Sequence, residues 1–397
     1  MGIIIRCLAA GLSLFFLNLR DLNAQAHSST IVSGYVFDDS NNNGLKDSNE
    51  KGVKGVAVSD QVTVVTTNED GFYQINYTSP YGILFISAPD GFQVTKNFWQ
   101  RVDTINHTIN FALKKIGVSN SFTFIQASDT HVSESSLDRM QRFRQIVDSV
   151  KPDFVIITGD LVRDALRVGE KEATHLYELF LSEMHKLSVP VWCIPGNHEI
   201  FGIERHLSLV SQQNPLYGRK MYRQYLGPDY YSFNYRGIHF IGLNSLEFED
   251  LWYYGRIDSV QLEWLKKDVA AVPPATPIVT FQHVPFFSGG FSMMPYEEDG
   301  LGRSLVREHG VLQYRHVVSN AQEVMSILKD HNYPLALAGH YHFQQKFSLE
   351  GFPTRFEQTA AVVATSEQGF ITLPSGITVY RVKDGRIDEG KFVRLDK

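Results

Sequence analysis

The sequence predicts a small all-β sandwich followed by a larger α/β domain with a largely parallel sheet. The chain has 397 residues, 43% of them apolar, which is more than one small domain needs for its core. Short strand-like runs fill residues 30–115, whereas strands alternate with helical patterns from residue 120 onward. We therefore expect domains at residues 27–116 and 117–397, after an N-terminal signal at residues 1–26.

The N-terminal segment is typical of an export signal. Arg6 supplies a positive charge, residues 7–19 are mostly apolar, and Ala24-Gln25-Ala26 has the small-x-small pattern of a cleavage site. The apolar run is shorter than the ~20 residues of a membrane span. Ile3 to Ile5 lengthen it, so an uncleaved anchor is the alternative. We expect a periplasmic, cell-surface or secreted protein without a transmembrane span once the signal is removed.

The first domain is expected to be a β-sandwich. Residues 31–37 and 55–58 are strand-like, and an Asn-Glu-Asp-Gly turn at 68–71 precedes the alternating residues 72–75. Several short strands in this length favour a sandwich. Residues 114–117 are the expected linker.

A loop within this domain has the spacing of an EF-hand calcium loop. Glycine stands at its sixth position, Gly44, and side-chain oxygens stand at positions 1, 3, 5, 9 and 12. The expected calcium ligands are Asp39, Asn41, Asn43, Asp47 and Glu50, with the Leu45 carbonyl. Strands flank the loop, so it resembles the calcium loops of bacterial surface β-sandwich modules. The alternative is an Asn-rich turn that binds no ion.

The second domain reads as alternating strands and helices. Apolar strands are expected at residues 122–127, 153–157, 189–194, 278–281 and 335–338, and helices at 136–150, 169–187, 260–272 and 320–331. A hairpin is expected at 230–243, and the tail alternates at 371–373 and 377–380. Continuous apolar strands separated by helices indicate buried, largely parallel pairing.

Polar clusters follow the apolar strands. They are Asp129-Thr130-His131, Gly159-Asp160, Gly196-Asn197-His198-Glu199, His283 and Gly339-His340-Tyr341-His342. Each cluster is a weak signal alone. Parallel strands bring their carboxyl ends to one edge of the sheet, where ligands bind, so the clusters are expected to converge on one site.

This set resembles the calcineurin-like metallophosphoesterases, whose pattern is Asp-x-His, Gly-Asp, Gly-Asn-His-(Asp/Glu), His and Gly-His-x-His. The resemblance covers residues 120–385 and implies a four-layer α/β/β/α sandwich. It implies that one metal is held by Asp129, His131, Asp160 and His342. It implies that the other is held by Asp160, Asn197, His283 and His340, with Asp160 bridging and His198 beside the leaving-group oxygen.

The expected chemistry is hydrolysis of a phosphate mono- or diester. Two divalent cations bring four positive charges, whereas Asp129 and Asp160 supply two negative ones, so the site suits an anion. Two metals about 3.5–4 Å apart can clamp the attacking and leaving oxygens and lower the pKa of bound water to about 7. We therefore predict direct attack by metal-held hydroxide. Nitrogen and oxygen ligands without thiolate favour Mn, Fe or Zn.

Several roles stay open in the sequence. His198 is either a general acid or transition-state donor, or a group that orients Asn197 or a neighbouring ligand. Asp164 either orients a ligand histidine or pairs with a nearby arginine, and Glu199 is undecided. Cys193 lies in an apolar run and is expected to be a core residue rather than a nucleophile.

An irregular stretch of about 35 residues is expected between His283 and the helix near Asn320. It is rich in aromatic residues, methionine and arginine: Phe286, Phe287, Phe291, Met293, Met294, Tyr296, Arg303 and Arg307. A second aromatic cluster is Phe248, Trp252, Tyr253 and Tyr254. The hypothesis is a lid over a nucleoside or lipid-like group, and the alternative is packing of the loop on itself.

Composition limits the partners. The net charge is -6 and charged residues make up 20%, so no nucleic-acid groove is expected. The partner that the resemblance and the expected chemistry imply is a small phosphate ester. The oligomeric state is left open.

One rival function is a binding or adhesion protein on a phosphoesterase fold that has lost turnover, although the full ligand set argues against it. An amidase or lactonase is the other rival, and Gly-Asn-His-Glu argues against that.

Overall fold

The computed structural model describes residues 30–103, 105, 107–117, 119–299, 303–368 and 371–396. The predicted export signal lies outside these residues. Within the described ranges, no helix combines the length and the apolar character that crossing a bilayer would require.

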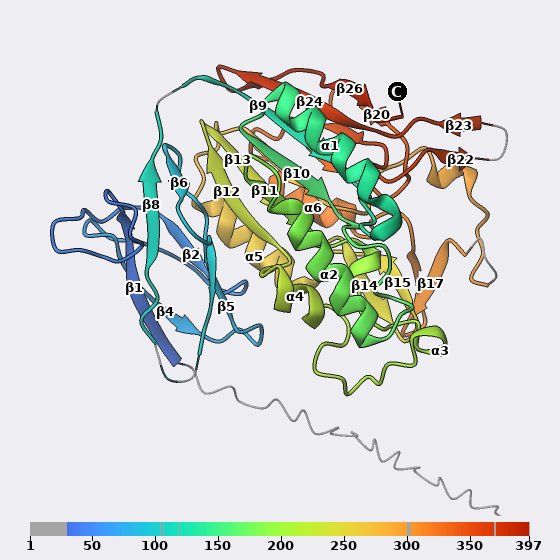
Figure 1. Ribbon diagram of the computed structural model, residues 1–397, viewed down its shortest axis with the longest axis horizontal. Helices are drawn as coiled ribbons and strands as arrows, with labels where there is room; N and C mark the ends of the chain where they lie inside the picture. The colour runs from blue at the N-terminus through green and yellow to red at the C-terminus, as the bar shows by residue number, and fades with distance from the viewer. Residues whose placement is uncertain are drawn as a thin grey trace, which may run out of the picture.

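Residues 30–115 form two four-stranded sheets packed face to face (Figure 1). One sheet has the order β4-β1-β8-β6, with strands Phe72–Tyr77, Thr30–Asp38, Phe111–Lys115 and Phe92–Val94. The other has the order β3-β2-β5-β7, with strands Val64–Thr66, Ala57–Ser59, Ile83–Ile86 and Trp99–Arg101. Alternate residues such as Val32, Ile75 and Phe111 are buried between the sheets. The linker was expected to begin at Lys114, which was wrong because Lys114 and Lys115 still pair with β6.

The rest of the chain is built on two six-stranded sheets. The first has the order β11-β10-β9-β24-β25, with strands Val191–Ile194, Phe154–Thr158, Ser121–Ala127, Gly376–Lys383 and Arg386–Ile387, and β26 (Lys391–Arg394) also pairs with β24. The second has the order β12-β13-β16-β19-β21-β20, with strands Tyr231–Tyr235, Ile238–Gly242, Ile278–Phe281, Leu335–Ala338, Arg355–Gln358 and Gln345–Phe347. The neighbours β9, β10 and β11 are parallel, as are β13, β16, β19 and β21.

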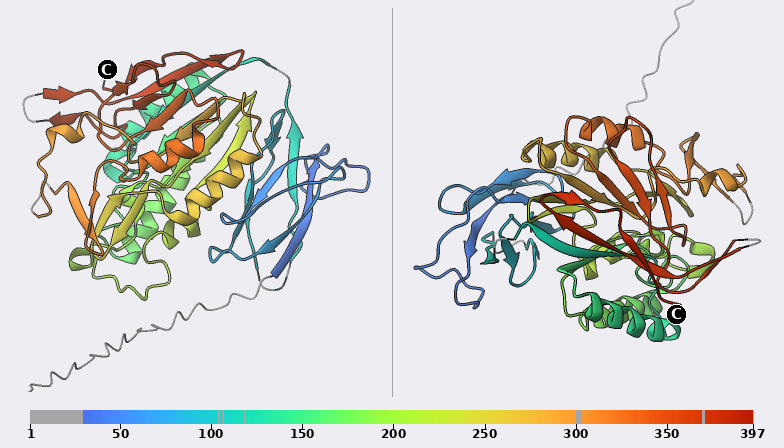
Figure 2. Two further views of the ribbon diagram at one scale, coloured as in Figure 1. Left: turned by 180° about the vertical axis from the view of Figure 1, so that it is seen from behind. Right: turned by 90° about the horizontal axis from the view of Figure 1, so that it is seen from above.

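Helices cover the outer face of each of these sheets (Figures 1 and 2). The first sheet carries α1 (Leu137–Val150) and α2 (Glu170–Met184), and the second carries α5 (Ser259–Ala270) and α6 (Ala321–Leu328). Aromatic side chains fill the space between the sheets. The Phe154 ring packs edge to face against two other rings. The distance between ring centroids is 5.6 Å to Phe233 and 5.4 Å to Phe240. The layers are α/β/β/α.

The sequence patterns explain these elements. In α1, Met140, Phe143 and Val147 fall on one helical face and are buried against the sheet. The helix ends where Lys151 adopts a left-handed conformation, and the Lys151 amide donates to the Val147 carbonyl. Every residue of β10 is buried, as expected for a strand covered on both faces.

The stretch between His283 and α6 is not irregular throughout, so that expectation was wrong. It holds a 3-10 turn, η3 (Phe291–Met293), and a hairpin of β17 (Leu305–Glu308) and β18 (Val311–Tyr314). Two further hairpins are β14–β15 (Leu246–Glu249 and Trp252–Gly255) and β22–β23 (Ser366–Gln368 and Ile371–Leu373). The short remaining helices are η1 (Glu134–Ser136), η2 (Asn197–Glu199), α3 (Arg205–Ser208) and α4 (Lys220–Tyr225).

The N-terminal sandwich shares a buried interface with the α/β part. Gln61 is fully buried, and its Nε2 donates to Asp229 Oδ1 at 3.0 Å. The Trp264 indole donates to Ser59 Oγ at 3.1 Å. The Phe98 ring also packs on the far side of this boundary, against aromatic rings of β11 and β12. The apolar core therefore continues across the boundary between the two parts.

Candidate metal centre

The polar clusters meet because of the strand order. Asp129, Asp160 and Asn197 follow β9, β10 and β11 of the first sheet. His283 and His340 follow β16 and β19 of the second sheet. The parallel strands of each sheet end on one edge, and these two edges lie against each other. The fold thereby brings all the predicted ligand positions to one place.

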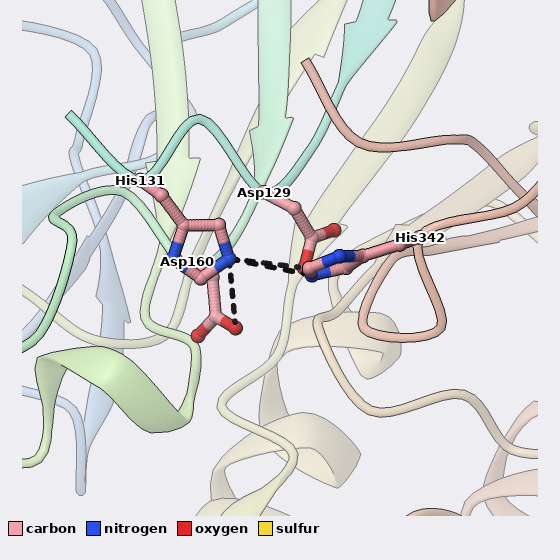
Figure 3. A group of neighbouring side chains, drawn as sticks. All are labelled: Asp129, His131, Asp160 and His342. Carbon is pink, nitrogen blue, oxygen red and sulfur yellow. Dashed lines mark hydrogen bonds and ion pairs between the residues drawn. The ribbon is translucent and has the colours of Figure 1, made fainter. Parts of the chain in front are cut away.

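One group of side chains comprises Asp129, His131, Asp160 and His342 (Figure 3). One ligand atom from each lies within 4.8 Å of the others. His342 Nε2 is 3.0 Å from Asp129 Oδ1, and His131 Nε2 is 3.7 Å from Asp160 Oδ2. The two histidines turn their Nε2 atoms toward each other at 3.3 Å.

A second group comprises Asp160, His283 and His340. His283 Nε2 is 3.2 Å from Asp160 Oδ2 and 3.1 Å from His340 Nδ1. The amide oxygen of Asn197 lies 3.2 Å from the same nitrogen. Asp160 belongs to both groups and lies between them.

The unpaired atoms of these groups fit divalent cations. Asp129 Oδ1 is buried and has no aligned hydrogen-bond donor, although His342 Nε2 is close by. The other ring nitrogen of His283 is occupied, because Nδ1 donates to the Thr158 carbonyl at 2.8 Å, so Nε2 is the atom that faces the site. Buried carboxylate oxygens and imidazole nitrogens that converge in this way are the donor set of a metal site.

The backbone at the site is strained. The φ angles are positive at five predicted ligands: Asp129 (52°), His131 (39°), Asp160 (49°), His340 (76°) and His342 (60°). Each such residue costs roughly 1–3 kcal/mol and persists only where the surrounding structure fixes it, which is common at functional sites.

Two glycines allow the strand ends to approach. A Cβ on Gly159, where φ is +83°, would lie 2.6 Å from His283 Nδ1. A Cβ on Gly196 would lie 2.2 Å from both the amide nitrogen and Oδ1 of Asp160. A side chain at either position would push a candidate ligand out of place.

Glu199 fastens two of the ligand loops together. Its Oε1 accepts from the amides of Leu161 (2.8 Å) and Val162 (2.9 Å), and its Oε2 accepts from the Gly196 amide (2.6 Å). Burial, and then the charge of Asp160, raise the pKa of Glu199 to about 8. The role left open for Glu199 is thus a scaffold for the loops that carry Asp160 and Asn197.

His198 lies at the mouth of the site. Its amide donates to Asp160 Oδ1 at 2.9 Å, and its Nδ1 lies 2.6 Å from the Arg163 carbonyl. The Nδ1–H is held by that carbonyl, so Nε2, which is 3.9 Å from Asp160 Oδ2, is the atom directed at the site. The carboxylate of Asp164 accepts from Arg167 at 3.0 Å, which agrees with its ion-pair alternative.

The carboxylates and histidines of the two groups shift one another's pKa. Burial opposes ionisation of Asp160, but His283 and His198 outweigh it and hold its pKa well below the usual value. Burial opposes protonation of His283, but Asp160 outweighs it and raises the pKa of His283 to about 9. Burial and His198 lower the pKa of His131 to about 4. Burial raises the pKa of Cys193 to about 12, so this thiol is a poor nucleophile.

Sequence reasoning missed His316, which contacts the site from the residues after β18. Its Nδ1 lies 2.7 Å from His340 Nε2, and its Nε2 lies 3.2 Å from the Arg303 carbonyl. This contact occupies the outer nitrogen of His340 and leaves His340 Nδ1 facing His283. A lone histidine in a region with no motif carries no signal of such a role.

The aromatic residues of the expected lid divide into two kinds. Phe286 and Phe291 are buried, and the Phe291 ring packs on Tyr314 of the same stretch with 5.1 Å between ring centroids, as the self-packing alternative requires. Met293 and Tyr296 are 71% and 67% exposed. Part of this stretch therefore packs against the domain, and other parts of it face solvent.

Comparison with known proteins places this geometry in a family. A model of the calcineurin-like phosphoesterases matches residues 122–344, and a model of the N-terminal region of these proteins matches residues 40–116. The chain is 24% identical to a probable cyclic nucleotide phosphodiesterase of Fibrobacter succinogenes, over 57% of this chain and 74% of that protein. It is 26% identical to a probable glycerophosphodiester phosphodiesterase GpdQ of Arcobacter nitrofigilis, over 45% of this chain and 63% of that protein.

Solved structures of similar fold include a dimetal phosphatase from Danio rerio, with a TM-score of 0.46 and 14% identity over 69% of this chain and 99% of that one. Another is PhoD, with a TM-score of 0.47 and 10% identity over 92% of this chain and 88% of that one. The family model spans more than half of the chain and includes every predicted metal ligand. The chain therefore belongs to the calcineurin-like phosphoesterase family.

Proposed function

We propose that this protein is a metal-dependent hydrolase of phosphate mono- or diesters that works without a covalent enzyme intermediate. The observation that carries the proposal is the shared position of Asp160, whose Oδ2 faces both groups of candidate ligands. When bound, two divalent ions would activate water and hold the phosphate oxygens. Both relatives are named as phosphodiesterases, which favours a diester.

The residues divide into two ligand sets in this proposal. Asp129, His131 and His342 hold one ion together with Asp160. Asn197, His283 and His340 hold the other, again with Asp160. Imidazole, carboxylate and amide donors without thiolate favour Mn, Fe or Zn.

His198 serves as the donor to the departing oxygen. The Arg163 carbonyl holds its Nδ1–H, so Nε2 can donate a proton only from the imidazolium form. The His198 amide donates a hydrogen bond to Asp160 Oδ1, and this contact holds the His198 ring close to both ligand groups. Orientation of Asn197 remains the alternative role.

The test is turnover of purified protein loaded separately with Mn and Zn, against panels of phosphate monoesters and diesters. The proposal predicts metal-dependent release of product that chelation abolishes and metal restores. The rival is a binding or adhesion protein on this fold. Metal-loaded protein that turns over no ester in either panel would favour that rival.

We also propose that the N-terminal loop binds a structural calcium. Asp39 Oδ2 accepts from the Gly44 amide at 2.9 Å, and Asn41 Oδ1 accepts from the Asn43 amide at 3.0 Å, so the loop is wrapped with oxygens turned inward. Among the described residues its carboxylates do not form a cluster as tight as those of the catalytic centre, so calcium would draw them together.

We also propose that the protein is exported. The positive charge, the apolar run and the small-x-small pattern of the N-terminal segment support this proposal.

A further inference from the structure

Arg315 carries a buried charge that the protein does not neutralise. It is 9% exposed, its Nε is buried without an acceptor, and no carboxylate in the described part of the chain lies within ion-pair distance of it. Other well-buried arginines have such partners: Arg223 pairs with Asp229 at 2.8 Å, and Arg219 pairs with Glu247. An unpaired buried charge destabilises the fold, because it has lost its contact with water and no partner of opposite charge compensates for that loss.

One aromatic ring separates this charge from a candidate metal ligand. The guanidinium carbon of Arg315 is 4.4 Å from the centre of the Tyr253 ring, and the Tyr253 ring is 6.2 Å from the His340 ring. The backbone holds Arg315 in place, because its amide donates to the Ser304 carbonyl at 2.8 Å. The next residue, His316, contacts His340 directly. Burial raises the pKa of Tyr253, whereas the positive charge of Arg315 lowers it.

A second guanidinium lies close to the first. The guanidinium carbon of Arg303 is 3.9 Å from the centre of the Trp252 ring, and that of Arg315 is 5.5 Å from the same ring. Arg303 has one acidic partner, Asp299, at 3.5 Å, whose side chain is fully exposed. The guanidinium groups of Arg303 and Arg315 thus both lie against the Trp252 indole, so this ring is not free to stack on a nucleobase.

The acidic residues around this position are engaged elsewhere. Trp252 and Arg303 line an open pocket that also holds four carboxylates, those of Glu249, Asp250, Glu298 and Asp299. Glu249 lies 3.7 Å from His309, and Asp299 is the partner of Arg303. Asp250 pairs with Arg205, and Glu298 pairs with Arg307 at 2.7 Å. Within the described residues, Arg315 has no carboxylate partner, and the Tyr253 ring lies between it and His340.

We propose that Arg315, supported by Arg303, forms an anion subsite beside the metal centre that binds a second anionic group of the substrate. This group is a phosphate or a carboxylate beyond the ester that is hydrolysed. The inference rests on the proposed phosphoesterase function and narrows its substrate class to esters with two anionic groups. A planar guanidinium pairs with the two oxygens of either group in the same way.

The test compares matched substrates that differ in one anionic group. One pair is the phosphate diester of thymidine and p-nitrophenol, compared with the same diester that carries a second phosphate group on the sugar. The other pair is phosphoglycerate against glycerol phosphate. Wild type should prefer the two-anion member by about tenfold or more in kcat/KM, as expected for a hydrogen-bonded charge pair. Arg315→Met should abolish the preference, so that the ratio of the two kcat/KM values falls to about one.

A stability measurement separates binding from a structural role. Arg315→Met removes an uncompensated buried charge, so its melting temperature should equal or exceed that of wild type. Arg307→Gln is the matched control, because Arg307 is an exposed arginine of the same hairpin, and it should keep the preference. A preference confined to the second phosphate or to the carboxylate supports the subsite and identifies its ligand.

The inference is overturned if wild type shows no preference in either pair, or if Arg315→Met lowers the melting temperature and slows both members alike. Absence of all turnover would instead defeat the proposed function. Calorimetric binding of phosphoglycerate to wild type but not to Arg315→Met would then still support the subsite.

Discussion

Asp160 Oδ2 lies 3.2 Å from His283 Nε2, although the two residues follow strands of different sheets. The other carboxylate oxygen of Asp160 is already occupied, because Oδ1 accepts the His198 amide at 2.9 Å. Oδ2 is therefore the atom that faces both ligand groups. One oxygen of Asp160 is thus used by the scaffold, and the other lies between the two groups of candidate ligands.

Replacing Asp160 should disrupt both ion positions. Asp160→Asn keeps the shape and an acceptor for the His198 amide but removes the negative charge. Loss of an outer partner of a metal ligand typically costs 10–100-fold, so loss of a shared ligand should lower kcat/KM by more than about 100-fold. Steady-state kinetics with parallel metal analysis will measure this. Asp164→Asn is the control, because Asp164 pairs with Arg167; an equal loss in both variants would contradict the assignment.

His316 should tune metal affinity through His340. His316→Phe removes the partner 2.7 Å from His340 Nε2 and should weaken metal binding by about 10–100-fold. His316→Asn retains an acceptor and should restore part of the affinity. Titration with Mn or Zn, followed by calorimetry, measures both. His309→Gln, an exposed position on the same hairpin, should behave as wild type, and an equal effect there would refute the role of His316.

Gly196 should accept no side chain. In Gly196→Ala the new Cβ would overlap Asp160, so metal content should fall and the apo protein should lose stability. Gly169→Ala is the control, because a Cβ at Gly169 meets nothing within 4 Å. Melting curves and metal analysis of the two variants decide the matter. Full metal content in Gly196→Ala would show that the loops can move apart without harm.

The buried pair of Asp229 and Arg223 should stabilise both domains together. Asp229→Asn leaves Arg223 buried and unpaired at the boundary that Gln61 crosses, which should cost about 3–5 kcal/mol. Burial opposes ionisation of Asp229, but Arg223 and Arg219 outweigh it and lower its pKa. A lowered pKa means that the contribution is complete above the usual value of 3.8 and is lost as pH falls through the lower folded-state value.

Denaturant unfolding between pH 7 and pH 3 measures this contribution. The difference between wild type and Asp229→Asn should stay constant down to about pH 5 and shrink below pH 4. Glu69→Gln removes one side of an exposed pair and should change stability by less than about 1 kcal/mol. Two separate unfolding transitions in wild type would argue against a shared interface.

Calcium should stabilise the full chain through the N-terminal loop. At a concentration 100 times the dissociation constant, binding to the folded state adds about 2.7 kcal/mol. Glu50→Gln removes a charge from the last ligand position and should abolish most of the shift in melting temperature. The measurement is thermal unfolding with and without millimolar calcium in the presence of saturating Mn. No shift in wild type would defeat the calcium proposal.

The convergence of the candidate ligands could be predicted because it depends on a rule of topology. A polar residue directly after a buried strand, as at Asp129 or His283, lies at the carboxyl edge whatever the rest of the chain does. The left-handed backbone at Asp129 and His340 could not be predicted in this way. It arises from contacts between loops that are far apart in the sequence.

The residues that sequence reasoning missed depend on tertiary contacts. His316 and Arg315 follow a hairpin of short strands on which Val311, Leu312 and Tyr314 remain exposed, so no alternation marked it. Gln61 gave no sign of burial either, because glutamine is usually exposed and its partner Asp229 lies in the other part of the chain.

The most direct test of the account is anomalous scattering from a crystal of the Mn-loaded protein. The account predicts two peaks about 3.5–4 Å apart, with one oxygen of Asp160 in the first coordination shell of both. A single peak, or two peaks of which only one contacts Asp160, would contradict it.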